Sequence, residues 1–197
     1  MEGNGQETDQ ALIAKAQRGS QEAMTTLYIR YRRKVLNYLY RFIGNRSTAE
    51  ELTQETFVRV VQNIHRYRPT GSAAGWIYRI AGNLAMNAMR DHPTTRELSL
   101  DEPVTLEEDT VERSEAIPGF GPKPDEEAVR MEREEAVQRC LMKLSSMHRE
   151  VVILCDIQGC SYREAADLLK CPVNTVASRL ARARAELAEL LGYLKKD

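Results

Sequence analysis

The sequence lacks any stretch that approaches the roughly 18 consecutive apolar residues of a membrane-spanning helix. Its first ten residues, MEGNGQETDQ, also lack the basic start and apolar core of a secretory signal. With 42% hydrophobic and 29% charged residues, the composition is that of an ordinary globular protein. We therefore expect a cytoplasmic protein that does not insert directly into a membrane.

Cysteine is scarce, and no cysteine pair has a metal-binding spacing. The four cysteines all fall in the last third of the chain, at Cys140, Cys155, Cys160 and Cys171. Because none of them forms a C-x-x-C pair, we expect reduced, mostly buried thiols and neither a metal ion nor another cofactor. A metal or redox site built from His148, Cys155 and Cys160 is the alternative, although these spacings match no standard site.

The net charge is also small, at −1, but the two signs are unevenly distributed. Residues 1–92 carry 13 Lys and Arg against 8 Asp and Glu, and residues 128–197 carry 12 against 10. Residues 93–127 carry 3 basic and 11 acidic side chains and contain five prolines, a composition typical of an extended linker. We therefore expect two small domains, 1–92 and 128–197, joined by an acidic linker.

Sustained strand-like alternation is missing, whereas apolar residues recur at helical spacing in both halves. The expected fold is therefore all-α, with breaks at Gly19, Gly44 and residues 69–71. Ser47, with Glu50 three residues later, predicts a capping box at the start of the third helix. The expected helices span residues 9–18, 20–43, 47–64, 74–90, 125–144, 147–157, 161–169 and 173–191.

Two of these helices carry a second, polar stripe beside their apolar one. The expected core positions are Leu52, Phe57, Val60, Val61 and Ile64 on the first, and Ile77, Ile80, Ala81, Leu84 and Ala88 on the second. The polar stripes consist of Glu51, Gln54, Glu55, Val58 and Gln62, and of Arg79, Asn83, Met86, Asn87 and Arg90. The first stripe suits docking on a basic partner helix, and the second suits phosphates and unstacked bases. The first stripe could instead simply face solvent.

Residues 161–187 have the pattern of a helix-turn-helix. Ser161 and Glu164 predict a capping box, Gly159 ends the preceding helix, and Pro172 interrupts one helix at the entrance of the next. Tyr162, Ala165, Ala166 and Leu169 form the expected buried face of the first helix, and Val176, Leu180, Ala183 and Leu187 that of the second. The second helix presents small and basic residues suited to DNA, at Asn174, Thr175, Ser178, Arg179 and Arg182. An ordinary helical hairpin with a solvated face is the alternative.

Three segments together resemble a known family. LSSMHREVVILCDIQGCSYREAADLLKCPVNTVASRLARARAEL resembles region 4 of sigma factors, which reads the minus-thirty-five promoter element. AEELTQETFVRVVQNIHRY and GWIYRIAGNLAMNAMRD resemble the sigma segments that bind the polymerase clamp and that melt and read the minus-ten element. Because only these two domains are recognisable, the chain resembles the extracytoplasmic-function sigma factors, a group linked to stress responses.

The resemblance implies partners and roles. It places Glu51, Gln54, Glu55, Val58 and Gln62 on the clamp helices of the beta-prime subunit, and the C-terminal domain on the beta flap of core RNA polymerase. It also implies that Asn83 lies by a pocket for a flipped base, with loop 67–75 as its rim. The expected minus-ten site is completed by Tyr67, Trp76, Arg79, Asn87 and Arg90. For Trp76 we expect packing in the core or a wedge at the duplex fork rather than stacking on a base. An anti-sigma factor is a further implied partner.

Other functions fit the sequence less well. A stand-alone helix-turn-helix regulator leaves the patterns of residues 49–91 unexplained. An enzyme acting on DNA needs a nucleophile or a carboxylate cluster, and the sequence offers neither in an organised setting, so we do not expect an enzyme. The acidic segment 101–109 would enter the polymerase cleft by resemblance, or serve as a passive tether.

Overall fold

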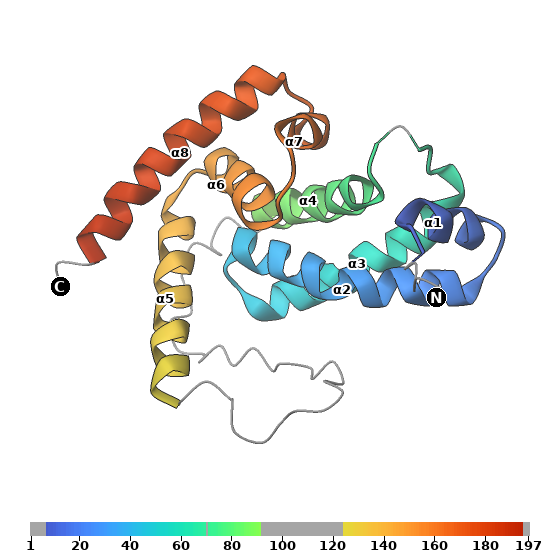
Figure 1. Cartoon of the computed structure of the whole chain (residues 1–197), viewed down its shortest axis with the longest axis horizontal. Coiled ribbons are helices and arrows are strands. Elements are labelled where there is room, and N and C mark those ends of the chain that lie inside the picture. Colours follow the sequence, from blue (N-terminus) through green and yellow to red (C-terminus); the bar gives the residue numbers. More distant parts are fainter. Residues whose placement is uncertain (1–6, 70, 92–123, 195–197) are drawn as a thin grey trace, which may run out of the picture.

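The computed structural model describes residues 7–69, 71–91 and 124–194, and in these ranges it contains helices and no strand (Figure 1). The expected all-α class is confirmed. The linker segment 101–109 lies outside the described residues. The helices are α1 (Asp9–Gln17), α2 (Gln21–Ile43), α3 (Arg46–Asn63), the short η1 (Ile64–Arg66), α4 (Ala73–Asp91), α5 (Pro124–Lys143), α6 (Ser146–Val152), the π-helical η2 (Ile153–Ile157), α7 (Tyr162–Leu169) and α8 (Val173–Leu194).

The start of α3 differs from the expectation. Gly44 ends α2 in the left-handed conformation, at φ 83°, and Asn45 immediately caps the next helix by accepting a 2.9 Å hydrogen bond from the Thr48 amide. Ser47 is therefore already inside α3, and Glu50 pairs with Arg46 instead of completing a capping box. The predicted box was wrong because asparagine caps a helix as well as serine does and stands directly after the glycine.

The predicted core face of α3 was also partly wrong. Val61 is 53% exposed, whereas Thr53 and Thr56 are buried in its place. Each threonine hydroxyl donates a 2.7 Å hydrogen bond to the carbonyl four residues earlier, on Ala49 and Leu52 respectively. A buried threonine with its hydroxyl satisfied in this way behaves like a small apolar residue, which a count of aliphatic side chains does not register.

The helix-turn-helix follows the expected pattern closely. Ser161 and Glu164 form the predicted capping box, Gly159 takes a positive φ of 72° after η2, and Lys170 ends α7 in the left-handed conformation. Val176, Leu180 and Ala183 of α8 are buried, while Leu187 packs on the core at its edge. One position differs, since Tyr162 stays 41% exposed.

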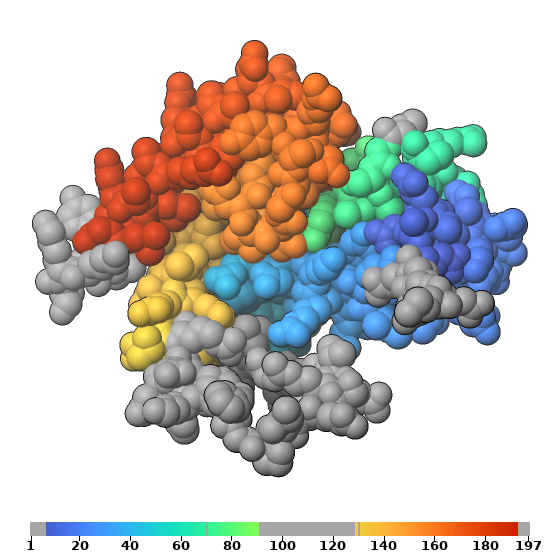
Figure 2. Space-filling view, viewed as in Figure 1, coloured from blue at the N-terminus to red at the C-terminus, as the bar shows by residue number. Residues whose placement is uncertain are grey.

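The two halves of the chain pack against each other. Helix α4 lies between α2 and α3 on one side and α7 on the other, and α2 also contacts α5, α6 and η2. The buried apolar residues of both halves form one contiguous cluster. Figure 2 shows this contact at the molecular surface, where the orange C-terminal half lies directly against the blue and green N-terminal half.

Arg149 of α6 is the main polar link in this packing. The residue is only 5% exposed, and its guanidinium donates hydrogen bonds to the carbonyls of Leu141, Met142 and Leu144 at the end of α5. It donates a further bond of 2.6 Å to the carbonyl of Phe42, in the last turn of α2. The carbonyl ends of helices carry partial negative charge, so one buried cation satisfies helix ends from both halves.

Substitution Arg149→Met should lower the free energy of unfolding by about 2–4 kcal/mol, because buried carbonyl oxygens lose their donor while the side-chain volume is largely kept. Urea unfolding followed by circular dichroism measures the change. Arg139→Met is the matched control, since Arg139 forms only an exposed pair with Glu135 and should contribute less than about 1 kcal/mol. Equal effects of the two substitutions would contradict the role given to Arg149.

Candidate nucleic-acid interface

The outward face of α4 carries the predicted minus-ten side chains. Arg79, Asn83, Asn87 and Arg90 are exposed on this face, and Met86 is half-buried. Arg90 donates a hydrogen bond to the side-chain oxygen of Asn87. The opposite face buries Ile77, Ala81 and Leu84, so α4 is anchored by one side and leaves cationic and amide groups on the other.

The loop before α4 is more tightly built than the sequence suggested. Tyr67 is only 8% exposed, its hydroxyl donates a 3.2 Å bond to the carbonyl of Gly71, and its ring centroid lies 5.1 Å from that of half-buried Trp76. The hydroxyl of Ser72 accepts a 3.0 Å bond from the amide of Gly75 at the start of α4. Tyr67 therefore shapes the loop from within and does not present its ring to solvent.

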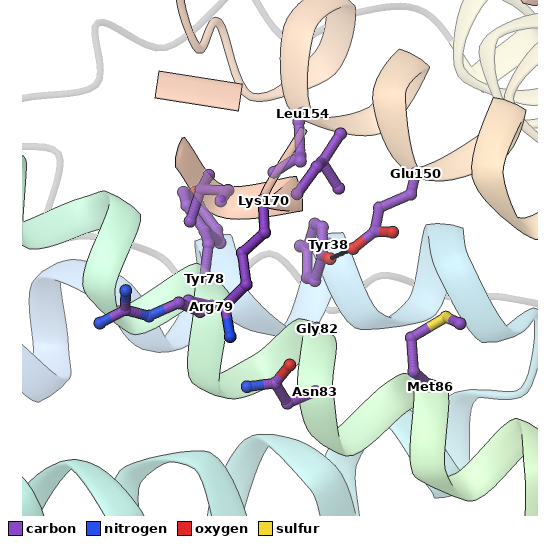
Figure 3. Close-up of a pocket in the computed structure, with 11 residues that line it drawn as sticks. Tyr38, Tyr78, Arg79, Gly82, Asn83, Met86, Glu150, Leu154 and Lys170 are labelled. Atoms are coloured by element: carbon purple, nitrogen blue, oxygen red, sulfur yellow. Dashed lines mark hydrogen bonds between the residues drawn. The ribbon is translucent and has the colours of Figure 1, made fainter. Parts of the chain in front are cut away.

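A small cavity beside Asn83 is closed by the other half of the chain. It measures about 160 Å³ and is lined on the α4 side by Arg79, Asn83 and Met86. Across from them lie Leu168, Leu169 and Lys170 of α7, with Glu150 and Leu154 behind. Figure 3 shows Lys170 reaching down from the end of α7 toward α4, into the space beside Asn83. Small-molecule pockets measure roughly 300–1,000 Å³, so this cavity is too small for a nucleotide.

A second cavity of about 370 Å³ lies between the loop and α7. Arg68, Trp76 and Arg79 line it from the N-terminal half, and Glu164 and Asp167 of α7 line it from the C-terminal half. Hydrogen bonds from Ser161 lower the pKa of the Glu164 carboxyl, and a hydrogen bond from Ser72, on the other side of the cavity, lowers it further by a smaller amount. The carboxylates of Glu164 and Asp167 thus line the same cavity as two arginines, whose guanidinium groups are suited to binding phosphates.

Two tyrosine hydroxyls connect the halves behind these cavities. Tyr78 donates a 2.6 Å bond to the side-chain oxygen of Gln158, and Tyr38 donates a 3.2 Å bond to Glu150. Burial raises the pKa of Glu150, while the Tyr38 hydrogen bond and the charge of Arg179 oppose that rise. A methyl group on Gly82 would lie 2.8 Å from the Tyr38 hydroxyl, so the absence of a side chain there permits this close approach.

The predicted minus-thirty-five residues lie together near the start of α8. Asn174, Ser178 and Arg182 are exposed, and Thr175 and Arg179 are half-buried. The Ser178 hydroxyl donates a 3.1 Å bond to the carbonyl of Thr175, within the same helix. The N-terminal turns of α8 therefore present side chains of the kind that contact base edges and phosphates.

The predicted polymerase-binding stripe lies on the open face of α3. Glu51, Gln54 and Gln62 are exposed, Val58 is 48% exposed, and Glu55 is half-buried. Glu55 accepts a 2.7 Å hydrogen bond from Arg59. The stripe side chains thus share one open face of α3, and the exposure of Val61 adds apolar area to that helix.

The structure gives no support to the alternative metal site. The described residues include no group of three or more His, Cys, Asp and Glu side chains that could hold a metal ion. His148 lies 3.2 Å from the Glu186 carboxylate, and burial raises the pKa of the Cys160 thiol to about 11. Cys140 is buried and the other three cysteines are half-buried, so the expectation of mostly buried thiols was too strong.

In the described part of the chain, no helix combines the length and apolarity of a membrane span.

Comparison with known proteins gives two family matches. Residues 27–94 match Sigma-70 region 2, and residues 134–187 match Sigma-70, region 4. The RNA polymerase sigma-H factor of Pseudomonas aeruginosa is 31% identical over 98% of both chains. The ECF RNA polymerase sigma factor SigW of Bacillus subtilis is 30% identical, over 91% of this chain and 94% of its own length.

Two solved structures have a fold similar to that of this chain. CnrH, in complex with the cytosolic domain of CnrY, superposes with a TM-score of 0.68 at 27% identity, covering 95% of this chain and 99% of CnrH. The sigma factor RpoE of Bartonella quintana, in complex with the anti-sigma factor NepR, gives a TM-score of 0.62 at 22% identity, covering 85% of this chain and 96% of RpoE. The second likeness concerns the fold alone.

The double substitution Tyr38→Phe and Tyr78→Phe should raise the amide hydrogen-exchange rate of α7 several-fold, because both hydroxyls that join the halves are lost while the rings still pack. Amides of α1, at the far side of the N-terminal half, should exchange as before. Tyr28→Phe is the control, since the Tyr28 ring packs on Phe57 within one half. Unchanged exchange in α7 would show that the tyrosines do not hold the halves together.

Proposed function

This chain belongs to the extracytoplasmic-function sigma factors of the sigma-70 family, and we propose that it uses three separate surfaces for the work of such factors. A sigma factor binds core RNA polymerase and directs initiation at specific promoters. In the proposal the chain itself is not an enzyme, because the polymerase makes the phosphodiester bonds. Residues 1–92 act as region 2, residues 128–197 as region 4, and residues 93–127 as the connector. The protein works in the cytoplasm.

The first proposed surface is the α3 stripe, which binds the clamp helices of the beta-prime subunit. Its exposed amides and carboxylates surround Val58, an apolar side chain that is 48% open to solvent. A partly apolar centre with a polar rim is the usual make-up of a protein interface. The region 4 half would contact the beta flap.

The second and third surfaces read the promoter. Asn174, Thr175, Ser178, Arg179 and Arg182 of α8 enter the major groove of the minus-thirty-five element, as the second helix of a helix-turn-helix does. Arg79, Asn83, Asn87 and Arg90 of α4 engage the opened minus-ten strand. A single observation supports this assignment best, namely that these four polar side chains share the one face of α4 that is not buried in its own half.

The closed arrangement is proposed to be that of the free protein, and it must open for promoter binding. Lys170 and the carboxylates of α7 cover the side of α4 that would meet the minus-ten strand. Core polymerase would provide the favourable binding to the open form that this change requires. RpoE of Bartonella quintana was solved in complex with the anti-sigma factor NepR, and we propose that an anti-sigma factor also holds this chain.

Run-off transcription with core polymerase tests the assignment of α4. The template is a promoter whose start site is mapped from transcripts after overexpression of this protein. Asn83→Ala should lower open-complex formation about tenfold or more, because one base-contacting hydrogen-bond pair contributes about 1–3 kcal/mol. Asn37→Ala removes an exposed asparagine from α2 and should leave the rate unchanged. Equal rates for Asn83→Ala and wild type would contradict the proposed minus-ten site.

Val58→Arg should weaken binding to core polymerase at least tenfold, since it places a charge in the centre of the proposed interface. Val129→Arg on α5 is the matched control, because Val129 has nearly the same exposure, 45% against 48%. Fluorescence anisotropy of labelled protein with core enzyme measures the affinity, and thermal unfolding checks that both variants fold. If both bind core polymerase as tightly as wild type, α3 is not the docking surface.

A further inference from the structure

Helix α1 lies before residues 27–94, the part that matches Sigma-70 region 2, yet it is built into the same half of the fold. Leu12, Ile13 and Ala16 are buried, and α1 packs on α2, α4 and η1. Asp9, near its start, accepts hydrogen bonds from Arg30 and Tyr31 of α2. The helix is therefore anchored along its length by contacts that do not involve its last residue.

That last residue, Gln17, makes two hydrogen bonds to a distant part of the chain. Its side-chain amide donates a 2.8 Å bond to the carbonyl of Ile64 and a 3.1 Å bond to the carbonyl of Tyr67. Ile64 is the first residue of η1, and Tyr67 follows its last residue, where the loop toward α4 begins. The backbone amide of Tyr67 also donates to the Ile64 carbonyl, at 3.1 Å. One amide group thus holds both ends of the turn from which the loop departs.

The position of the loop depends on this turn. The Tyr67 hydroxyl holds Gly71 of the loop by its hydrogen bond, and the Tyr67 ring packs on the ring of Trp76 in α4. Ser72 then connects the loop to the first turn of α4. A shift of the Tyr67 backbone would therefore move the loop side of the cavity that lies between the loop and α7.

We propose that Gln17 is a positioning residue for the base-reading loop. This inference rests on the function proposed above, in which residues 67–75 form the rim of the pocket for a flipped minus-ten base. Gln17 touches no base itself. It fixes the Ile64 and Tyr67 carbonyls, so that the loop meets an incoming base in one geometry, and the fold of the N-terminal half stands without it.

The test measures base preference, which a merely structural role would not change. Holoenzyme containing Gln17→Met is titrated with single-stranded minus-ten oligonucleotides that carry each of the four bases at the flipped position. The ratio of affinities between the best and the worst base should fall about three- to tenfold, as expected when base-contacting groups are held loosely. Thermal unfolding, core binding and binding to a minus-thirty-five duplex should stay as in wild type. Exchange of the amides of Gly71 and Ser72 should become faster.

Gln10→Met is the matched control, since Gln10 is an exposed glutamine on the same helix. Unchanged base preference in Gln17→Met, or an equal loss of affinity for all four bases together with a lower unfolding temperature, would overturn the proposal. Asn83→Ala in the same titration separates the two claims. If it flattens the preference and Gln17→Met does not, only the role of Gln17 is wrong. If neither variant changes the preference, the proposed pocket is wrong and the role of Gln17 falls with it.

Discussion

The buried guanidinium of Arg149 is the interaction on which the arrangement of the whole chain depends. A cation that is 5% exposed is costly to bury unless its donors are satisfied, and here they meet the carbonyl ends of α5 and α2. The bond to Phe42 ties the C-terminal half to the N-terminal half at the end of α2. Because the apolar cluster also runs through both halves, α6 and α7 are brought against α4 in one defined orientation.

That orientation explains why the face of α4 that we propose reads the promoter is partly covered. Besides Arg149 and the apolar cluster, a few hydrogen bonds such as those of Tyr38 and Tyr78 join the halves, and cavities remain between them. Such bonds contribute only about 1 kcal/mol each, so binding to a large partner can exchange them for new contacts. In the proposed function, a sigma factor built in this way has weak access to DNA when free and full access once polymerase has separated its halves.

Much of the fold followed from sequence patterns. The helices, the capping box at Ser161 and the polar stripes of α3 and α4 depend on local spacing, which the sequence displays directly. The errors on α3 were local, since Asn45 caps the helix in place of Ser47 and two threonines with internally bonded hydroxyls take core positions. Local spacing cannot show contacts between residues far apart in the chain. Gln17 finds its partners about 50 residues away, and Arg149 bonds to helix ends from both halves.

The most direct test asks whether α7 leaves α4 when the polymerase binds. A benzophenone amino acid in place of Asp167, which lines the cavity between α7 and the loop, reports its neighbours by photocrosslinking. In the free protein the crosslink should map to residues 67–79 of the same chain. In an open promoter complex that makes transcripts, this internal crosslink should disappear, replaced by crosslinks to DNA or polymerase. If it persists undiminished in the transcribing complex, the halves do not separate and the account is wrong.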